Sequence, residues 1–123
     1  MDKEIFVEFS EDADKDYEEL QKNVLEEKKK GLENSFNMQL LKAIDREKDN
    51  LKINPQHGIH ITRKNISKSV VERYGTDRLW KINLPDYWRM IYTITGNDVK
   101  IISFVLDFMD HKKYNKVLGY RKK

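Results

Sequence analysis

The spacing of apolar residues changes near Arg78, and this change constrains the fold more than any other feature. From there to Phe108, apolar and polar residues alternate in three runs, "RLWKINL", "YWRMIYTI" and "VKIISFVLDF", which are separated by the turn sequences "PD" and "TGND". A period of two is typical of β-strands, because successive side chains point to opposite faces of a sheet. The pattern therefore predicts an antiparallel meander.

The last of these runs is apolar on both faces. One face is expected to carry Ile102, Phe104, Leu106 and Phe108, and the other mostly Val99, Ile101 and Val105. A strand with two apolar faces must be covered on both sides, so we expect it to be central in the sheet.

The first half of the chain predicts one strand and a pair of helices. "EIFVEF" alternates like a short strand, and apolar residues then recur at helical spacing from Ser10 or Asp12 to about Gly31, and from about Ser35 to Asn54. Because a short loop joins the two helices, they are expected to form an antiparallel hairpin. A further short helix in "ISKSVVERYG" is expected to end at its glycine.

These elements predict one α+β domain over residues 1–123. An N-terminal strand and a helical hairpin pack on one face of an antiparallel β-sheet, and a short basic segment follows at the C-terminus. The length suits a single hydrophobic core, to which we assign Trp80 and Trp88. The other face of the sheet is expected to be uncovered and to carry Lys81, Asn83 and Arg89.

Whether Lys81 and Arg89 share that face depends on the turn between their strands. Residues directly opposite each other in an antiparallel pair project to the same side of the sheet. A two-residue turn would pair Ile82 with Arg89 and bury the arginine charge without a partner. A three-residue turn, Leu84 to Asp86, instead pairs Lys81 with Arg89, and we predict this turn.

Several classes of protein are excluded or disfavoured by composition. The chain has no cysteine, so it has neither disulfides nor thiolate metal sites. His57 and His60, in or beside the "NPQHG" break, lack a third ligand nearby and are expected to be solvated, so we predict no metal and no cofactor. No apolar run approaches the roughly 20 residues that span a bilayer, and "MDKEIFVEF" lacks the features of a signal peptide. We expect a cytoplasmic protein without membrane contact.

Charge is unevenly distributed along the chain. Residues 1–34 contain 12 acidic residues and 6 lysines and arginines, whereas residues 55–123 contain 6 and 14. The chain ends on "FMDHKKYNKVLGYRKK", in which no acid follows His111. A basic half of this kind suits a polyanion such as nucleic acid, because phosphate contacts supply most of the sequence-independent affinity. A solvated basic surface that maintains solubility is the alternative.

The residues from Tyr74 onward resemble a known family. "YGTDRLWKINLPDYWRMIYTI", followed by "VLDFMDHKKYNKVLGY", resembles the RelE/ParE superfamily of toxins from type II toxin-antitoxin systems, in particular its RelE- and HigB-like branches. The order of elements along the whole chain agrees with this resemblance. It implies a ribosome-dependent mRNA endoribonuclease (an mRNA interferase) that inhibits translation and uses no metal. The implied partners are the ribosome, mRNA and a cognate antitoxin, the last in a hetero-oligomer.

In that family the ribose 2′-hydroxyl attacks the adjacent phosphate, which requires a base, an acid and positive charge beside the phosphate. By position, the resemblance gives catalytic roles to Lys81, Arg89, His111 and Tyr114. Arg89 would hold the phosphate, Lys81 would bind it or act as a base, and His111 would be an acid or base. Tyr114 would stack on a base or hydrogen-bond the reacting groups. The implied RNA-binding residues are Asn83, Lys112, Lys113, Lys116 and Arg121.

The sequence departs from the family pattern in two places. Asn83 stands where many members have a second lysine, and Asp110 and His111 stand where members have an arginine. An acid such as Asp110 fits poorly beside a phosphate. For each of the four catalytic candidates a purely structural or solvated role also remains open.

Two other functions are compatible with the same fold. A ParE-like toxin binds and poisons DNA gyrase without a catalytic cluster, and an inactive member would only bind RNA or the ribosome. The presence of His111 and Tyr114 together with two cations on the strands favours the nuclease.

Overall fold

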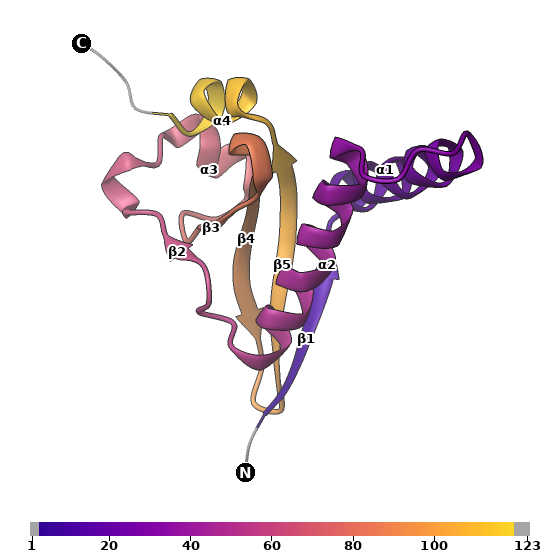
Figure 1. The fold of residues 1–123 in the computed structure, drawn as a ribbon. Helices are drawn as coiled ribbons and strands as arrows, with labels where there is room; N and C mark the ends of the chain where they lie inside the picture. The colour runs from indigo at the N-terminus through magenta and orange to yellow at the C-terminus, as the bar shows by residue number, and fades with distance from the viewer. Residues whose placement is uncertain (1–2, 120–123) are drawn as a thin grey trace.

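A five-stranded sheet forms the middle of the structure, with its strands in the order β1-β5-β4-β3-β2 (Figure 1). The computed structural model describes residues 3–119. The strands are β1 (Glu4–Phe9), β2 (Ile59–His60), β3 (Trp80–Asn83), β4 (Arg89–Gly96) and β5 (Lys100–Met109). β1 pairs with β5 in parallel, and the other neighbours are antiparallel. β5 is an interior strand, as its two apolar faces predicted, and the predicted α+β fold is confirmed.

Two long helices, α1 (Glu11–Lys29) and α2 (Phe36–Ile53), form the predicted hairpin on one side of the sheet (Figure 1). Each helix begins after a serine, Ser10 or Ser35, whose hydroxyl accepts a hydrogen bond from the backbone N–H three residues later, at 3.1 and 3.2 Å. These caps satisfy N–H groups that have no partner inside the helix. α1 ends before Gly31, which adopts the left-handed conformation with φ of 87°.

Apolar side chains of the hairpin and of one sheet face make the main core. Trp80 and Trp88 pack against it, as predicted, and each is half-buried. The buried members are Ala13, Leu20, Val24, Met38, Leu40, Ala43, Ile44, Leu51, Ile82, Leu84, Met90, Tyr92, Val105 and Phe108.

The opposite face of the sheet is not uncovered, which corrects the expectation from the sequence. Two short helices, α3 (Lys68–Tyr74) and α4 (His111–Val117), help to enclose a second apolar cluster on that face (Figure 1). Its buried members are Ile61, Val70, Leu79, Ile91, Leu106, Met109 and Leu118. The basic segment after β5 therefore begins as a helix that packs on the sheet.

A β-bulge in β5 changes which side chains share a face. Ile91 lies opposite Asp107, whereas the next residue of β4, Tyr92, lies opposite Val105, so Leu106 is an extra residue. As a result Leu106 belongs to the second cluster, while Phe108 belongs to the main core. The expectation that Leu106 and Phe108 share a face is wrong, because simple alternation does not reveal a bulge.

The turn between β3 and β4 has the predicted three residues but is displaced by one. It consists of Pro85–Tyr87 rather than Leu84–Asp86. Asn83 therefore lies opposite Arg89, so the predicted pairing of Arg89 with Lys81 is wrong by two residues. Because the turn has an odd length, the two cations still project from the same face of the sheet.

The sequence pattern does not predict β2, whose position depends on Gly58. The N–H of Gly58 donates to Tyr92 Oη at 3.0 Å. A Cβ at this glycine would lie 2.8 Å from that oxygen and 2.8 Å from the carbonyl oxygen of Lys81, so a larger residue cannot approach the sheet this closely. Gly58 thus brings the segment that follows it beside β3 and Lys81.

Both histidines of this region lie at the surface, and each makes one specific contact. His57 Nε2 lies 2.8 Å from Glu47 Oε1, and the His60 ring packs edge-on against Trp80 with 4.9 Å between centroids. Within residues 3–119, no group of three or more His, Cys, Asp or Glu side chains is arranged to hold a metal ion. No helix in this part of the chain is long and apolar enough to cross a membrane.

Candidate active site

Lys81 and Tyr114 meet on the sheet face that carries the second apolar cluster. Lys81 lies on β3, between Ile59 of β2 and Ile91 of β4. Its Nζ donates a hydrogen bond to Tyr114 Oη at 3.1 Å and lies 5.1 Å from the centroid of the tyrosine ring. Both side chains are half-buried. The fold thus joins two of the predicted catalytic residues that lie far apart in the sequence.

Arg89 approaches the same tyrosine ring from the start of β4. Its guanidinium carbon lies 4.9 Å from the Tyr114 centroid. Nη1 donates to the carbonyl oxygens of Tyr87, at 2.6 Å, and Trp88, at 3.4 Å, while Nε is buried without a hydrogen-bond partner among the described residues. The cation is therefore half-buried and fixed in orientation. We call Lys81, Arg89 and Tyr114 the cationic cluster.

Carboxylates do not neutralise the cationic cluster within the described part of the chain. The ion pairs found there involve Arg46, His57, Arg63, Arg73 and Lys113, and neither cation of the cluster. Asp110, the acid that departs from the family pattern, is the N-cap of α4, and its Oδ1 accepts a hydrogen bond from the Lys113 N–H at 2.8 Å. The Asp110 carboxylate therefore caps α4 and forms no ion pair with Lys81 or Arg89.

The helix α4 places its polar residues on two sides. Tyr114 and Asn115 line the side that faces Lys81, while Lys112, Lys113 and Lys116 line a hollow together with Arg73. His111 lies at the edge of the cationic cluster, where its ring is 5.4 Å from the ring of Tyr87 and its Nε2 is 3.1 Å from Asn115 Nδ2. The structure thus brings three of the four catalytic candidates into contact and leaves His111 at their rim.

The predicted RNA-binding residues fall in three places. Asn83 is exposed on the face of the cationic cluster, opposite Arg89. Lys112 and Lys116 are exposed on the outer side of α4. Lys113 turns inward to a carboxylate, and Arg121 lies outside the described residues.

That carboxylate is Asp107, the most buried charged group near the site, with 4% of its surface exposed. Its Oδ1 accepts a hydrogen bond from Lys113 Nζ at 3.1 Å, and its Oδ2 accepts one from Tyr74 Oη at 2.8 Å. Burial, and then this bond to Asp107, raise the pKa of Tyr74 well above its usual value, so the phenol stays a neutral donor. Asp107 thus joins β5 to both short helices. Sequence reasoning missed it, although an acid within the apolar run "FVLDFM" is a recognisable signal.

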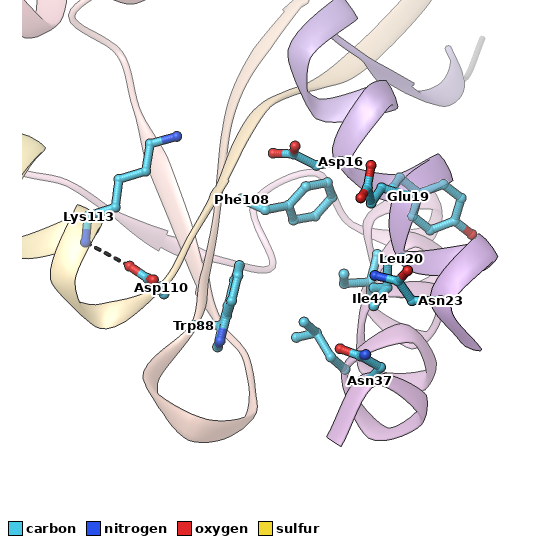
Figure 2. A pocket seen from close by; sticks show the side chains of 12 residues that line it. Asp16, Glu19, Leu20, Asn23, Asn37, Ile44, Trp88, Phe108, Asp110 and Lys113 are labelled. Carbon is cyan, nitrogen blue, oxygen red and sulfur yellow. Dashed lines mark hydrogen bonds between the residues drawn. The ribbon is translucent and has the colours of Figure 1, made fainter. Parts of the chain in front are cut away.

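A second concave region lies on the hairpin side, between α1, α2 and the end of the sheet (Figure 2). This cleft has a volume of about 380 Å³ and an apolar floor formed by Leu20, Leu40, Ile44, Trp88 and Phe108. Asp16, Glu19 and Asp110 give its rim an acidic character, with Lys113 beside them. Burial, and then the neighbouring Asp107 carboxylate, raise the pKa of Asp16, although Lys113 opposes the shift.

The fold is that of RelE/ParE-like proteins, a helical hairpin on one face of a mostly antiparallel sheet. Over residues 7–113 the chain matches the family model described as "ParE toxin of type II toxin-antitoxin system, parDE". Because the match covers most of the chain, the protein belongs to this toxin family, and the resemblance to the superfamily is confirmed. Membership implies an antitoxin partner. A search of curated proteins found no match to the chain. The narrower likeness to the RelE- and HigB-like branches stays a prediction.

Proposed function

We propose that this toxin is an endoribonuclease that cleaves mRNA on the ribosome. The observation that carries the proposal is the convergence of Lys81 and Arg89 on Tyr114, with no carboxylate paired to either cation in the described residues. Two adjacent cations without a counter-ion are suited to a phosphate group, since each would otherwise repel the other.

In this proposal Arg89 and Lys81 bind the scissile phosphate and stabilise the negative charge that develops on it. The guanidinium of Arg89 is held by two backbone carbonyls, to which Nη1 donates. A fixed donor of this kind needs little reorganisation during the reaction, which makes it effective in the transition state.

Tyr114 is the proposed acid. Its oxygen accepts a hydrogen bond from Lys81 Nζ, so its own hydrogen is available to another acceptor. As the 2′-oxygen attacks phosphorus and the bond to the 5′-oxygen breaks, Tyr114 protonates the leaving oxygen. His111, at the rim of the cationic cluster, is the proposed base that takes the proton of the 2′-hydroxyl. The products are a 2′,3′-cyclic phosphate and a free 5′-hydroxyl.

The remaining basic residues have an electrostatic role in this proposal. Lys112 and Lys116 on the outer side of α4 are exposed beside Arg73 of α3, and there they contact RNA phosphates. Asn83 adds a hydrogen bond beside Arg89, and the positive charge of Arg121 favours RNA binding wherever that residue lies. Lys113 contributes mainly through its ion pair with Asp107. The site of action is the cytoplasm, where mRNA is translated.

The decisive experiment is to map mRNA 5′ ends after induction of the toxin. The wild-type chain should create new ends within translated codons, and Lys81→Met or Arg89→Lys should reduce them about 100-fold, because each removes transition-state charge stabilisation. Lys42→Met, at an exposed lysine of α2, is the matched control and should leave cleavage unchanged. An absence of new ends with the wild-type chain would exclude the nuclease.

The family match favours one other function, the inhibition of DNA gyrase, because the matching family is that of ParE toxins. In this case purified toxin should block supercoiling of plasmid DNA by gyrase, and induction should cause a DNA-damage response without new mRNA ends. Lys81→Met should then have no greater effect than Lys42→Met.

The cleft on the hairpin side is the proposed binding site of the antitoxin. Its apolar floor suits the apolar face of an amphipathic segment, and its acidic rim suits basic residues beside that face. The floor of the cleft lies on the hairpin side of the sheet, but its rim includes Asp110 and Lys113, next to the tyrosine of the cationic cluster. Antitoxin bound there can therefore make further contacts with the basic face.

A further inference from the structure

A groove of about 770 Å³ continues from the cationic cluster along the chain segment that follows Gly58. One wall is formed by residues of β2 and of the 3-10 turn Arg63–Asn65, and the other by α4. Lys81 and Tyr114 also line the groove, so it is continuous with the proposed active site. Its volume is in the range of pockets that bind small organic ligands, and it is large enough for a nucleotide.

The chemistry of the groove lining is that of an anion site with many hydrogen-bonding groups. Residues 59–67 contribute His60, Thr62, Lys64, Asn65 and Ser67, and none of the residues that line the groove is acidic. Lysine and histidine suit phosphate groups, whereas amides and hydroxyls suit the edges of bases and the ribose hydroxyls. The exposed imidazole of His60, held edge-on against Trp80, offers a flat surface for a base.

The wall opposite α4 is held in place before any ligand binds. The backbone N–H of Ile61 donates to the carbonyl of Leu79 at 2.9 Å and extends the pairing of β2 with β3. Arg63 forms an ion pair with Asp77 at 3.1 Å, and the Ser67 hydroxyl caps α3. A preformed wall lowers the entropic cost of binding.

We propose that this groove binds the single-stranded ribonucleotides that flank the scissile phosphate, with Lys64 on a phosphate and His60 against a base. Single-stranded RNA fits better than a duplex, because unstacked bases present their edges and faces to side chains while those of a duplex do not. The identity of the ligand as RNA rests on the proposed nuclease function, whereas the location of the groove does not.

Binding of a short single-stranded RNA with 2′-O-methyl riboses tests the groove separately from cleavage, since such RNA lacks the attacking hydroxyl. Fluorescence anisotropy with purified toxin should show that Lys64→Met weakens binding about 5-fold at ~0.1 M salt. It should also lower the slope of log affinity against log salt by about 0.7, the value for one phosphate contact on a single strand. His60→Ala should weaken binding by a similar factor with no change in slope. Lys68→Met, at an exposed lysine of α3 outside the groove lining, is the matched control.

The outcomes separate this inference from the proposed function. Equal affinity and equal salt slope for Lys64→Met and Lys68→Met would show that the groove does not bind RNA, even if the wild-type chain cleaves mRNA. If the groove variants lose RNA binding but the wild-type chain creates no new mRNA ends, the groove binds RNA and the proposed nuclease function is excluded. Equal affinity for a duplex of the same length would also overturn the inference. Circular dichroism of each variant shows whether its fold is retained.

Discussion

Tyr87 has a backbone conformation that side-chain-bearing residues seldom adopt. Its φ is 64°, next to Asp86 with φ of 56°. Asp is tolerated in this left-handed region, whereas a bulky residue is destabilised there by roughly 1–2 kcal/mol. The Tyr87 carbonyl accepts the hydrogen bond of Arg89, and its ring, 67% exposed, lies beside His111. Strained residues of this kind are often found at functional sites.

We predict that Tyr87→Gly stabilises the fold by about 0.5–1 kcal/mol. Glycine adopts positive φ without strain, and this gain exceeds the extra chain entropy that glycine loses on folding. The same variant should cleave mRNA less well, since the exposed ring is lost beside the cationic cluster. Urea unfolding measures the first effect, and 5′-end mapping the second. Tyr87→Phe keeps the ring and serves as the control. Lower stability of Tyr87→Gly would show that the contacts of the ring contribute more to stability than the release of backbone strain.

A second prediction concerns Asp16, whose pKa in the folded protein is raised from 3.8 by burial and by Asp107. The folded state therefore binds the Asp16 proton more tightly than the unfolded state, so ionisation of this carboxyl lowers stability as pH rises. Asp16→Asn should raise the melting temperature at pH 7, and the gain should shrink as pH falls toward about 4 and vanish below it, where the carboxyl is protonated in both the folded and the unfolded state. Glu18→Gln, on the same helix, is the control. A gain that grows toward acid pH would contradict this account.

At the scale of elements, Asp107 determines how α3 and α4 sit on the sheet. Three groups from these helices reach its carboxylate: Tyr74 Oη at 2.8 Å, Lys113 Nζ at 3.1 Å and Arg73 Nη2 at 3.9 Å. Tyr114 follows Lys113 directly in the chain. An ion pair that fixes Lys113 therefore also helps to fix Tyr114 over Lys81.

We predict that Asp107→Asn lowers the free energy of unfolding by about 2 kcal/mol, the usual range for the loss of hydrogen bonds to a buried charged group. The effect is moderated because Lys113 is partly exposed to water. Amide hydrogen exchange of α4 should increase more than that of α1. Tyr74→Phe removes one hydrogen bond only and should cost about 1 kcal/mol. Unchanged exchange in α4 would show that apolar contacts alone hold the helix.

The two faces of the sheet carry different candidate sites. The hairpin side carries the cleft with an acidic rim, and the other side carries the cationic cluster and its groove. The two regions meet at Asp110 and Lys113, which line the rim of the cleft. Substitutions of residues that line only one region, such as Glu19 or Lys81, should leave the function of the other largely intact, because distant sites usually contribute independently.

This separation predicts opposite phenotypes for two variants. Lys81→Met should lose toxicity while binding the antitoxin within about 2-fold of wild type. Glu19→Lys reverses one charge of the cleft rim and should stay toxic, but should bind the antitoxin about 10-fold more weakly, the effect of losing roughly 1.4 kcal/mol. Growth assays and titration calorimetry with the antitoxin measure the two effects. Equal affinity of Glu19→Lys and wild type would place the antitoxin elsewhere.

The sequence by itself determined the features that depend on neighbouring residues. The order of strands and helices, apart from β2 and α4, follows from local periods and turn residues. The shared face of Lys81 and Arg89 follows from the parity of one turn, even though the exact pairing was displaced by two residues. These features need only backbone geometry and the burial of apolar side chains.

Only the tertiary structure decided what lies over that face. The bulge at Leu106, the second apolar cluster, the anchor at Asp107 and the groove beside Gly58 all depend on segments that are distant in sequence. A period of two looks the same with or without a bulge, and an acid looks the same whether it caps a helix, as Asp110 does, or pairs with a lysine. The physical reason is that these outcomes follow from packing between elements, which no local pattern records.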